Sequence, residues 1–191
     1  MLAAFQEAFV ALAADAAARR CFARDAAAYL AGFELDEAER AALCAIPREQ
    51  LESYARSLVA KRWGELARVV PLSLRVAPSL RERHRAWALE HPARVRDDVL
   101  SPGAAEGLRA LAPLCARLTA HEGEAAYAAD LLAFEVLRAA SGEDGLPRSL
   151  RSRFALAELA ERVARGLLPI DPELAPTELR FERERVSWRP A

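Results

Sequence analysis

The chain has 191 residues, a formal net charge of -1 and a hydrophobic fraction of 53%. This length suits one well-cored domain, or one domain with a small appendage, that folds without covalent staples. Three cysteines, with no CxxC pair and no histidine at ligand spacing, argue against a disulfide framework and against a zinc site. Small core cysteines in a reducing, cytoplasmic compartment are expected.

The N-terminal stretch MLAAFQEAFVALAADAAARR is apolar only in part. Gln6, Glu7 and Asp15 interrupt it and no charged segment precedes it, so neither a signal peptide nor a membrane span is predicted. The apolar spacing predicts one helix over 2–20 and a short helix over 24–31.

The next segments carry helix start and stop signals. Asp36 followed by Glu39 resembles a capping box that opens a helix through Ile46. An apolar stripe over 48–70 predicts an amphipathic helix of about six turns. Prolines then end this helix, and further helices are predicted at 79–91, 102–119 and 123–140, followed by a loop at 141–147.

The pattern changes near the C-terminus. The segment SRFALAEL at 152–159 suits the start of a strand or of a helix, and ELRFERERVSW at 178–188 alternates as a strand does. The predicted fold is mainly α, a bundle of five to seven helices with a small two-strand β feature at the C-terminus. The predicted parts are an N-terminal helical segment (1–46), a helical core (47–147) and a C-terminal α/β appendage (148–191).

The charges are unevenly distributed along the chain. Residues 48–96 hold 11 Lys or Arg against 5 acids, whereas 1–47 hold 4 against 7 and 97–147 hold 3 against 9. Opposite charges on adjacent helices would largely cancel, which argues against a nucleic-acid face, because such a face needs an unopposed basic surface.

No sequence motif points to catalysis. The chain has no GxSxG, HExxH, Walker or GxGxxG pattern. His84 and His91 are two helical turns and roughly 10 Å apart, too far to bind one metal ion, and His121 lies in another segment. All three are expected at the surface or at helix ends, and no catalytic, cofactor or metal residue is predicted.

Candidate binding residues come from the basic and aromatic positions. They form either a core edge with solvated basic neighbours or a contact face for a partner, in which Arg and Trp are common anchors. The candidates are Lys61, Arg62, Trp63, Arg81, Arg85 and Trp87.

Three further candidates lie downstream. Asp130, in the apolar helix, is either a buried acid bound to an arginine or a carboxylate in a peptide groove. Arg183 and Arg185 lie on the predicted strand, which could add an extended acidic peptide to its edge.

The order of features over about 50–160 resembles a known family. A helix ending in Lys61-Arg62 leads to PLSLRVAPSLRERHRAWALEHP, an acidic gap, DLLAFEVLRAA and SRFALAEL. This order resembles the small helical proteins that accompany multinuclear-iron, TIM-barrel enzymes of the methanobactin type, which modify ribosomally made peptides. The resemblance implies a non-catalytic partner that binds a precursor peptide, while the iron belongs to the partner enzyme.

A second resemblance covers residues 22–46. The segment FARDAAAYLAGFELDEAERAALCAI resembles a helical segment in the small subunit of protocatechuate-type extradiol dioxygenases and in some helical precursor-binding domains. It implies a docking or covering module without a metal. Two alternatives stay open: a helical DNA-binding or regulatory protein, and a small non-catalytic dioxygenase subunit.

Overall fold

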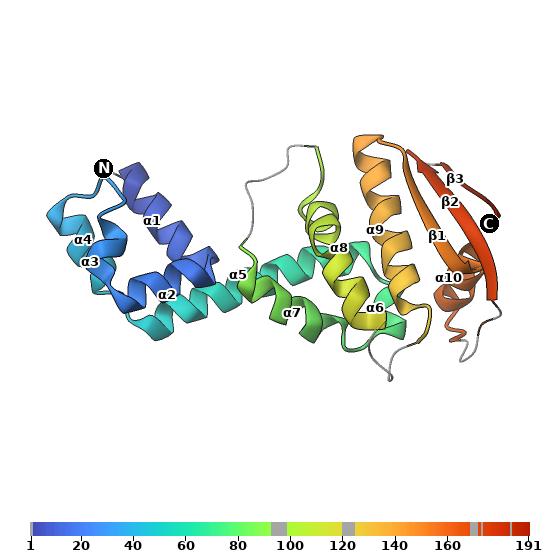
Figure 1. Ribbon diagram of the computed structural model, residues 1–191, viewed down its shortest axis with the longest axis horizontal. Helices are drawn as coiled ribbons and strands as arrows, with labels where there is room; N and C mark the ends of the chain where they lie inside the picture. Colours follow the sequence, from blue (N-terminus) through green and yellow to red (C-terminus); the bar gives the residue numbers. More distant parts are fainter. Residues whose placement is uncertain (1, 93–98, 120–124, 169–171, 173, 184) are drawn as a thin grey trace. The chain divides into compact units, whose positions relative to one another are not determined.

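The computed structural model describes residues 2–92, 99–119, 125–168, 172, 174–183 and 185–191. In these residues the fold is mainly α, with ten helices and one three-stranded antiparallel sheet at the C-terminus (Figure 1). The predicted fold class is confirmed, although the described residues form ten helices where five to seven were expected and three strands where two were expected. The chain forms two compact units, the first drawn from 1–61 and 85–95 and the second from 62–84 and 96–191. The three predicted parts stay a prediction.

The first unit is helical. It contains α1 (Leu2–Ala14), α2 (Ala16–Arg24), α3 (Ala26–Leu30), α4 (Glu37–Cys44), the beginning of α5 (Arg48–Val69) and the end of α7 (Leu80–Glu90). Its core is a cluster of Ala8, Leu12, Leu30, Leu35, Leu43 and Leu51. Aromatic side chains pack around this cluster, so a small helical unit buries a continuous apolar centre.

Three aspartates, Asp15, Asp25 and Asp36, cap helix starts in this unit. The Asp15 side chain accepts a hydrogen bond from Ala17 N at 2.7 Å and caps α2, so the single helix predicted over 2–20 is wrong. Asp36 accepts from Glu39 N at 2.8 Å while Glu39 accepts from Asp36 N at 3.0 Å. The predicted capping box is therefore confirmed.

The second unit combines helices with the sheet. It contains the end of α5, the beginning of α7, α6 (Ser73–Val76), α8 (Pro102–Thr119), α9 (Ala128–Asp144), β1 (Arg148–Phe154), α10 (Leu156–Ala164), β2 (Leu174–Glu182) and β3 (Arg185–Pro190). The loop predicted at 141–147 is wrong in part, because α9 continues to Asp144 and ends at Gly145, which has a left-handed φ of 70°.

The sheet has the order β1-β2-β3. The single strand predicted over 178–188 is wrong, since β2 ends at Glu182 and β3 begins at Arg185 after a turn in which Arg183 has a left-handed φ of 50°. Arginine is not a typical residue for this conformation, so the sequence carried no turn signal there. The segment 152–159 contains both a strand end and a helix start.

Two expectations about single residues are also wrong. His84 is fully buried rather than at the surface or a helix end. Cys21 and Cys44 are exposed, whereas Cys115 is half-buried. Burial raises the pKa of the Cys115 thiol to about 11, which leaves it protonated and unreactive at neutral pH.

Candidate functional site

Strand β3 forms a free edge of the sheet. Among the described residues it pairs only with β2, and five of its six residues are exposed (Figure 1). The opposite edge strand, β1, is instead tied to α9, because Asp130 accepts hydrogen bonds from Ser152 Oγ at 2.8 Å and from the backbone N–H of Arg153 at 3.4 Å. The outer edge of β3 is thus the side of the sheet at which another strand can pair.

The hydrogen-bonding register between β2 and β3 determines which backbone groups of β3 point away from β2. Ala191 N donates to Pro176 O at 3.0 Å, which places this pair at a hydrogen-bonding position. Because such positions alternate in antiparallel pairs, Ser187 and Arg189 bond to β2, whereas Val186 and Trp188 direct their N–H and C=O groups outward. Pro190 also lies at an outward position, where its missing N–H breaks no bond to β2.

The two sides of β3 differ in chemistry. Val186 and Trp188 pair with Phe181 and Leu179, both buried, so they lie on the side covered by helices. Trp188 is nevertheless 59% exposed, at the margin of this side. The other side of the strand carries Arg185, Ser187 and Arg189, all exposed. Each β3 residue therefore faces either an apolar or a cationic surface.

The open side of the sheet is rich in arginine. Exposed arginines on it come from all three strands: Arg151, Arg180, Arg185 and Arg189. They outnumber the acids Glu178 and Glu182. Glu178 accepts from Arg189 Nε at 2.9 Å, and this bond, with the Arg180 and Arg151 charges, holds the pKa of Glu178 below its ordinary value. The carboxylate stays ionised, and the surface keeps a surplus of positive charge.

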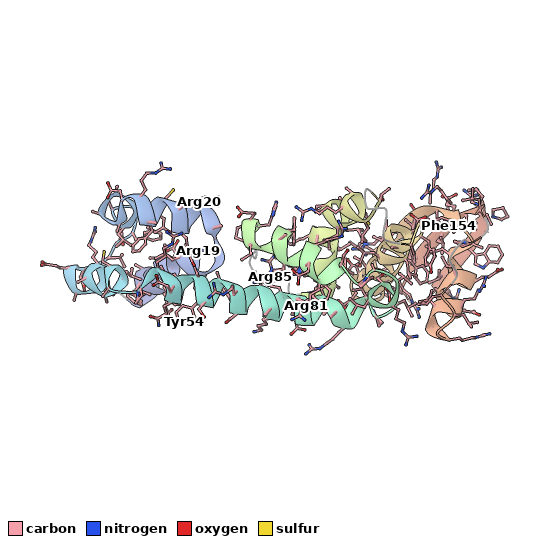
Figure 2. The ribbon with its side chains drawn as sticks, turned by 90° about the horizontal axis from the view of Figure 1, so that it is seen from below. Arg19, Arg20, Tyr54, Arg81, Arg85 and Phe154 are labelled. Atoms are coloured by element: carbon pink, nitrogen blue, oxygen red, sulfur yellow. The ribbon has the colours of Figure 1, made fainter. Side chains whose placement is uncertain are left out.

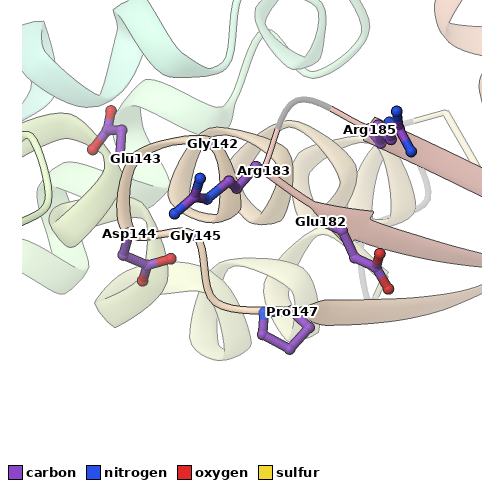
Figure 3. Close-up of a pocket in the computed structure, with 8 residues that line it drawn as sticks. All are labelled: Gly142, Glu143, Asp144, Gly145, Pro147, Glu182, Arg183 and Arg185. Carbon is purple, nitrogen blue, oxygen red and sulfur yellow. The ribbon is translucent and has the colours of Figure 1, made fainter.

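An open depression of about 860 Å³ lies between the end of α9 and the β2–β3 turn (Figure 3). Two of its three acids are engaged, since Asp144 pairs with Arg148 at 2.6 Å and Glu143 accepts from Ser101 N at 2.6 Å, whereas Glu182 forms no ion pair among the described residues. Arg183 and Arg185 line the same depression, and neither forms an ion pair with any residue that the structure describes. They are available to an anionic ligand.

No known family model, characterised protein or solved structure matches this chain. The resemblance to partner proteins of multinuclear-iron enzymes, and that of residues 22–46 to a dioxygenase small subunit, therefore stay predictions. Among the helices of the described residues, none combines the length and apolarity needed to cross a membrane.

Of the two adjacent basic residues Lys61 and Arg62, Arg62 has a mainly structural role. Lys61 is exposed, but the Arg62 side chain is only 13% exposed and its Nη2 lies 2.9 Å from Glu106 Oε1. The half-buried Trp63 packs on His84 with ring centroids 5.5 Å apart. A partner-binding role for these three residues stays a prediction. Arg62 and Trp63 would have to serve it while also packing inside the protein.

The candidate residues on α7 are likewise partly exposed and partly buried. Arg81 and Arg85 are exposed (Figure 2), whereas Trp87 is buried and stacks on His91 at 4.9 Å. Trp87 thus stabilises the first unit. Asp130 is half-buried and binds Ser152, not the arginine side chain suggested by the sequence.

A depression of about 600 Å³ in the first unit is also lined by arginines (Figure 2). Three of its four arginines have intramolecular partners, whereas Arg24 forms no ion pair among the described residues. Arg20 pairs with Glu90 at 3.1 Å, Arg48 pairs with Glu52 at 2.8 Å, and Arg19 donates to Leu12 O at 3.0 Å. The depression at the sheet edge differs in having two arginines without an ion pair among the described residues, Arg183 and Arg185, next to the exposed strand β3.

The structure also contains two buried carboxylates whose partners the sequence did not reveal. Glu106 of α8 is 5% exposed and lies 2.7 Å from His84 Nε2. Desolvation raises its pKa, but the hydrogen bond from His84 and the Arg62 charge outweigh this and lower the pKa below the ordinary value. Glu135 of α9 accepts from Leu72 N, Ser73 N and Ser73 Oγ at 2.7, 2.8 and 2.6 Å and thereby holds the start of α6.

No group of three or more His, Cys, Asp or Glu side chains within the described ranges could hold a metal ion. His121 lies outside the described residues. The expectation that iron is bound by a separate partner enzyme stays a prediction.

Proposed function

We propose that this chain is a non-catalytic recognition subunit that binds an extended acidic segment of a ribosomally made precursor peptide and presents it to a separate multinuclear-iron enzyme. The observation that carries the peptide-binding part is the free, arginine-flanked edge of β3. The nature of the enzyme rests on the sequence resemblance alone.

Strand addition suits this edge physically. An added strand satisfies the outward backbone groups of Val186 and Trp188, and each such hydrogen bond contributes about 1 kcal/mol net. Arg183 and Arg185 supply positive charge beside the strand without first leaving an internal ion pair in the described structure. Main-chain bonds then provide affinity, and the arginines favour carboxylates.

The alternative of a DNA-binding protein is less well supported. Of the basic residues that it would use, Arg62 is bound to Glu106, and Arg83 donates to Arg117 O at 2.9 Å and to Ser79 Oγ at 2.5 Å. Releasing them to contact phosphates would cost these internal interactions. A DNA-binding role predicts a steep fall of affinity with salt and no need for a peptide.

Substitution Val186→Pro tests strand addition. Proline removes an outward N–H and leaves the ladder between β2 and β3 intact, so peptide affinity is expected to fall at least tenfold while the fold persists. Val186→Thr keeps the N–H and the branched side chain, and it serves as the matched control with near-normal affinity. Fluorescence anisotropy with a labelled acidic peptide measures binding, and circular dichroism measures folding. Equal affinity for both variants would contradict strand addition.

Co-expression with a multinuclear-iron enzyme and its precursor peptide tests the wider proposal. A stable complex containing iron and peptide is the expected result. A chain that stays monomeric and instead shifts duplex DNA at physiological salt would overturn it.

A further inference from the structure

We infer that the peptide segment recognised by β3 alternates over five residues in the order acidic, apolar, any, apolar, acidic. This inference rests on the proposed strand addition and specifies which peptides that edge accepts. It concerns the residues opposite Arg185 to Arg189.

The alternation follows from the geometry of paired strands. Residues directly opposite each other in a sheet direct their side chains to the same face, with Cβ atoms about 5 Å apart. A residue that pairs with Trp188 or Val186 must therefore lie on the helix-covered side. A residue that pairs with Arg185 or Arg189 must lie on the open side.

The helix-covered side favours apolar side chains. Trp188 borders a shallow notch that is also lined by Leu156 of α10 and by Leu179 of β2. The notch holds about 20 Å³, close to the space of one water, so it accepts the end of one aliphatic side chain and not a ring. A peptide side chain there would cover the exposed indole of Trp188.

The open side favours acidic side chains at both ends of the five-residue stretch. Arg185 has no ion pair among the described residues, and Arg189 donates to Glu178 through Nε and Nη2, which leaves its Nη1 for a second carboxylate. The middle peptide residue lies opposite Ser187, which places no charge on it.

Strand β2 already satisfies this pattern on the inner edge of β3. Its residues 178–182 read ELRFE, and in the strand register Glu178 lies opposite Arg189, Leu179 opposite Trp188, Phe181 opposite Val186 and Glu182 opposite Arg185. Of the two charged pairs, Glu178 and Arg189 form an ion pair in the described structure. An outer strand of the same pattern repeats pairings that the sheet contains. Because the pattern reads the same in both directions, parallel and antiparallel peptides both satisfy the side-chain requirement.

A second copy of the chain is a poorer occupant. Antiparallel pairing of two β3 strands about Ser187 would place Arg185 of one copy opposite Arg189 of the other. Like charges directly opposite each other destabilise a sheet. In this register, which engages the outward groups of both Val186 and Trp188, the charges favour a different, acidic strand over a second copy.

Two peptides of identical composition test the inference. One contains Glu-Val-Thr-Val-Glu and the other contains Glu-Glu-Thr-Val-Val, with the same flanking residues. The first is expected to bind at least tenfold more tightly in an anisotropy titration. Arg185→Glu should weaken this binding about tenfold, and a peptide with one terminal Glu changed to Lys should restore it.

The outcomes separate the inference from the proposed function. Equal affinity for the two peptides, lost in Val186→Pro, would overturn the alternation and leave strand addition standing. Binding of neither peptide, or a concentration-dependent dimer without peptide binding, would overturn both.

Discussion

Substitution Glu106→Ala is expected to lower the free energy of unfolding by about 4 kcal/mol, the range found when one partner of a buried ion pair is removed. Glu106 is 5% exposed and holds the side chains of Arg62 and His84 on two other helices, with Arg109 Nη1 3.3 Å from its second oxygen. The variant would leave the Arg62 guanidinium and the buried His84 imidazole without this carboxylate. Urea denaturation measures the loss.

Matched variants separate charge from volume in this network. Glu106→Gln keeps the size of the side chain but not the charge, so most of the loss should remain. Glu161→Ala removes an exposed partner of Arg165, and it should cost less than about 1 kcal/mol. If Glu106→Ala and Glu161→Ala lowered the free energy of unfolding equally, the buried ion pairs of Glu106 would contribute no more to stability than an exposed ion pair.

The same carboxylate should make stability depend on pH. Since the folded-state pKa of Glu106 lies below its ordinary value, its ionised form stabilises the fold above the unfolded-state pKa. This stabilisation is lost as pH falls through the folded-state pKa. The stability difference between the wild type and Glu106→Ala should thus narrow below about pH 4.5. The charged or titratable groups that face Glu106 are Arg62, His84 and Arg109. A difference that widens in acid would contradict this assignment.

Gly103→Ala is expected to destabilise the protein by about 3 kcal/mol, because overpacking forces neighbouring elements apart. A Cβ at Gly103 of α8 would overlap the carbonyl oxygen of Glu65 and lie 2.8 Å from Val69 Cγ2. A backbone oxygen cannot turn aside as a flexible side chain can, so α5 and α8 would have to separate.

Gly64→Ala provides the opposite control. Gly64 lies in α5, and a Cβ there would meet no atom within 4 Å. Alanine should stabilise the helix by about 0.5–1 kcal/mol because it reduces the freedom of the unfolded chain. Denaturant midpoints should therefore shift in opposite directions for the two variants. A neutral Gly103→Ala would contradict the close approach of α5 and α8.

Local signals predicted much of the helical structure. The capping box at Asp36 and Glu39 and the start of α8 at Pro102 depend on neighbouring residues, and the structure has both. The break at Asp15 was missed because the surrounding alanines favour an unbroken helix, although the aspartate itself was a capping signal.

Tertiary contacts and turn geometry were harder to predict. The charged spacing on α7 gave no sign that His84 is buried, because its partner Glu106 lies 22 residues away. The alternation over 178–188 predicted strand structure at the correct place but not the turn at Arg183. That turn decides the candidate site, since it makes β3 a separate edge strand with outward backbone groups.

Residue-resolved amide hydrogen exchange with the Glu-Val-Thr-Val-Glu peptide tests strand addition most directly. In the free protein, the amides of Ser187 and Arg189 should be protected by β2, while those of Val186 and Trp188 exchange rapidly. Saturating peptide should slow exchange at Val186 and Trp188 by at least tenfold. If these two amides keep their exchange rates while the peptide is bound, β3 is not the binding edge.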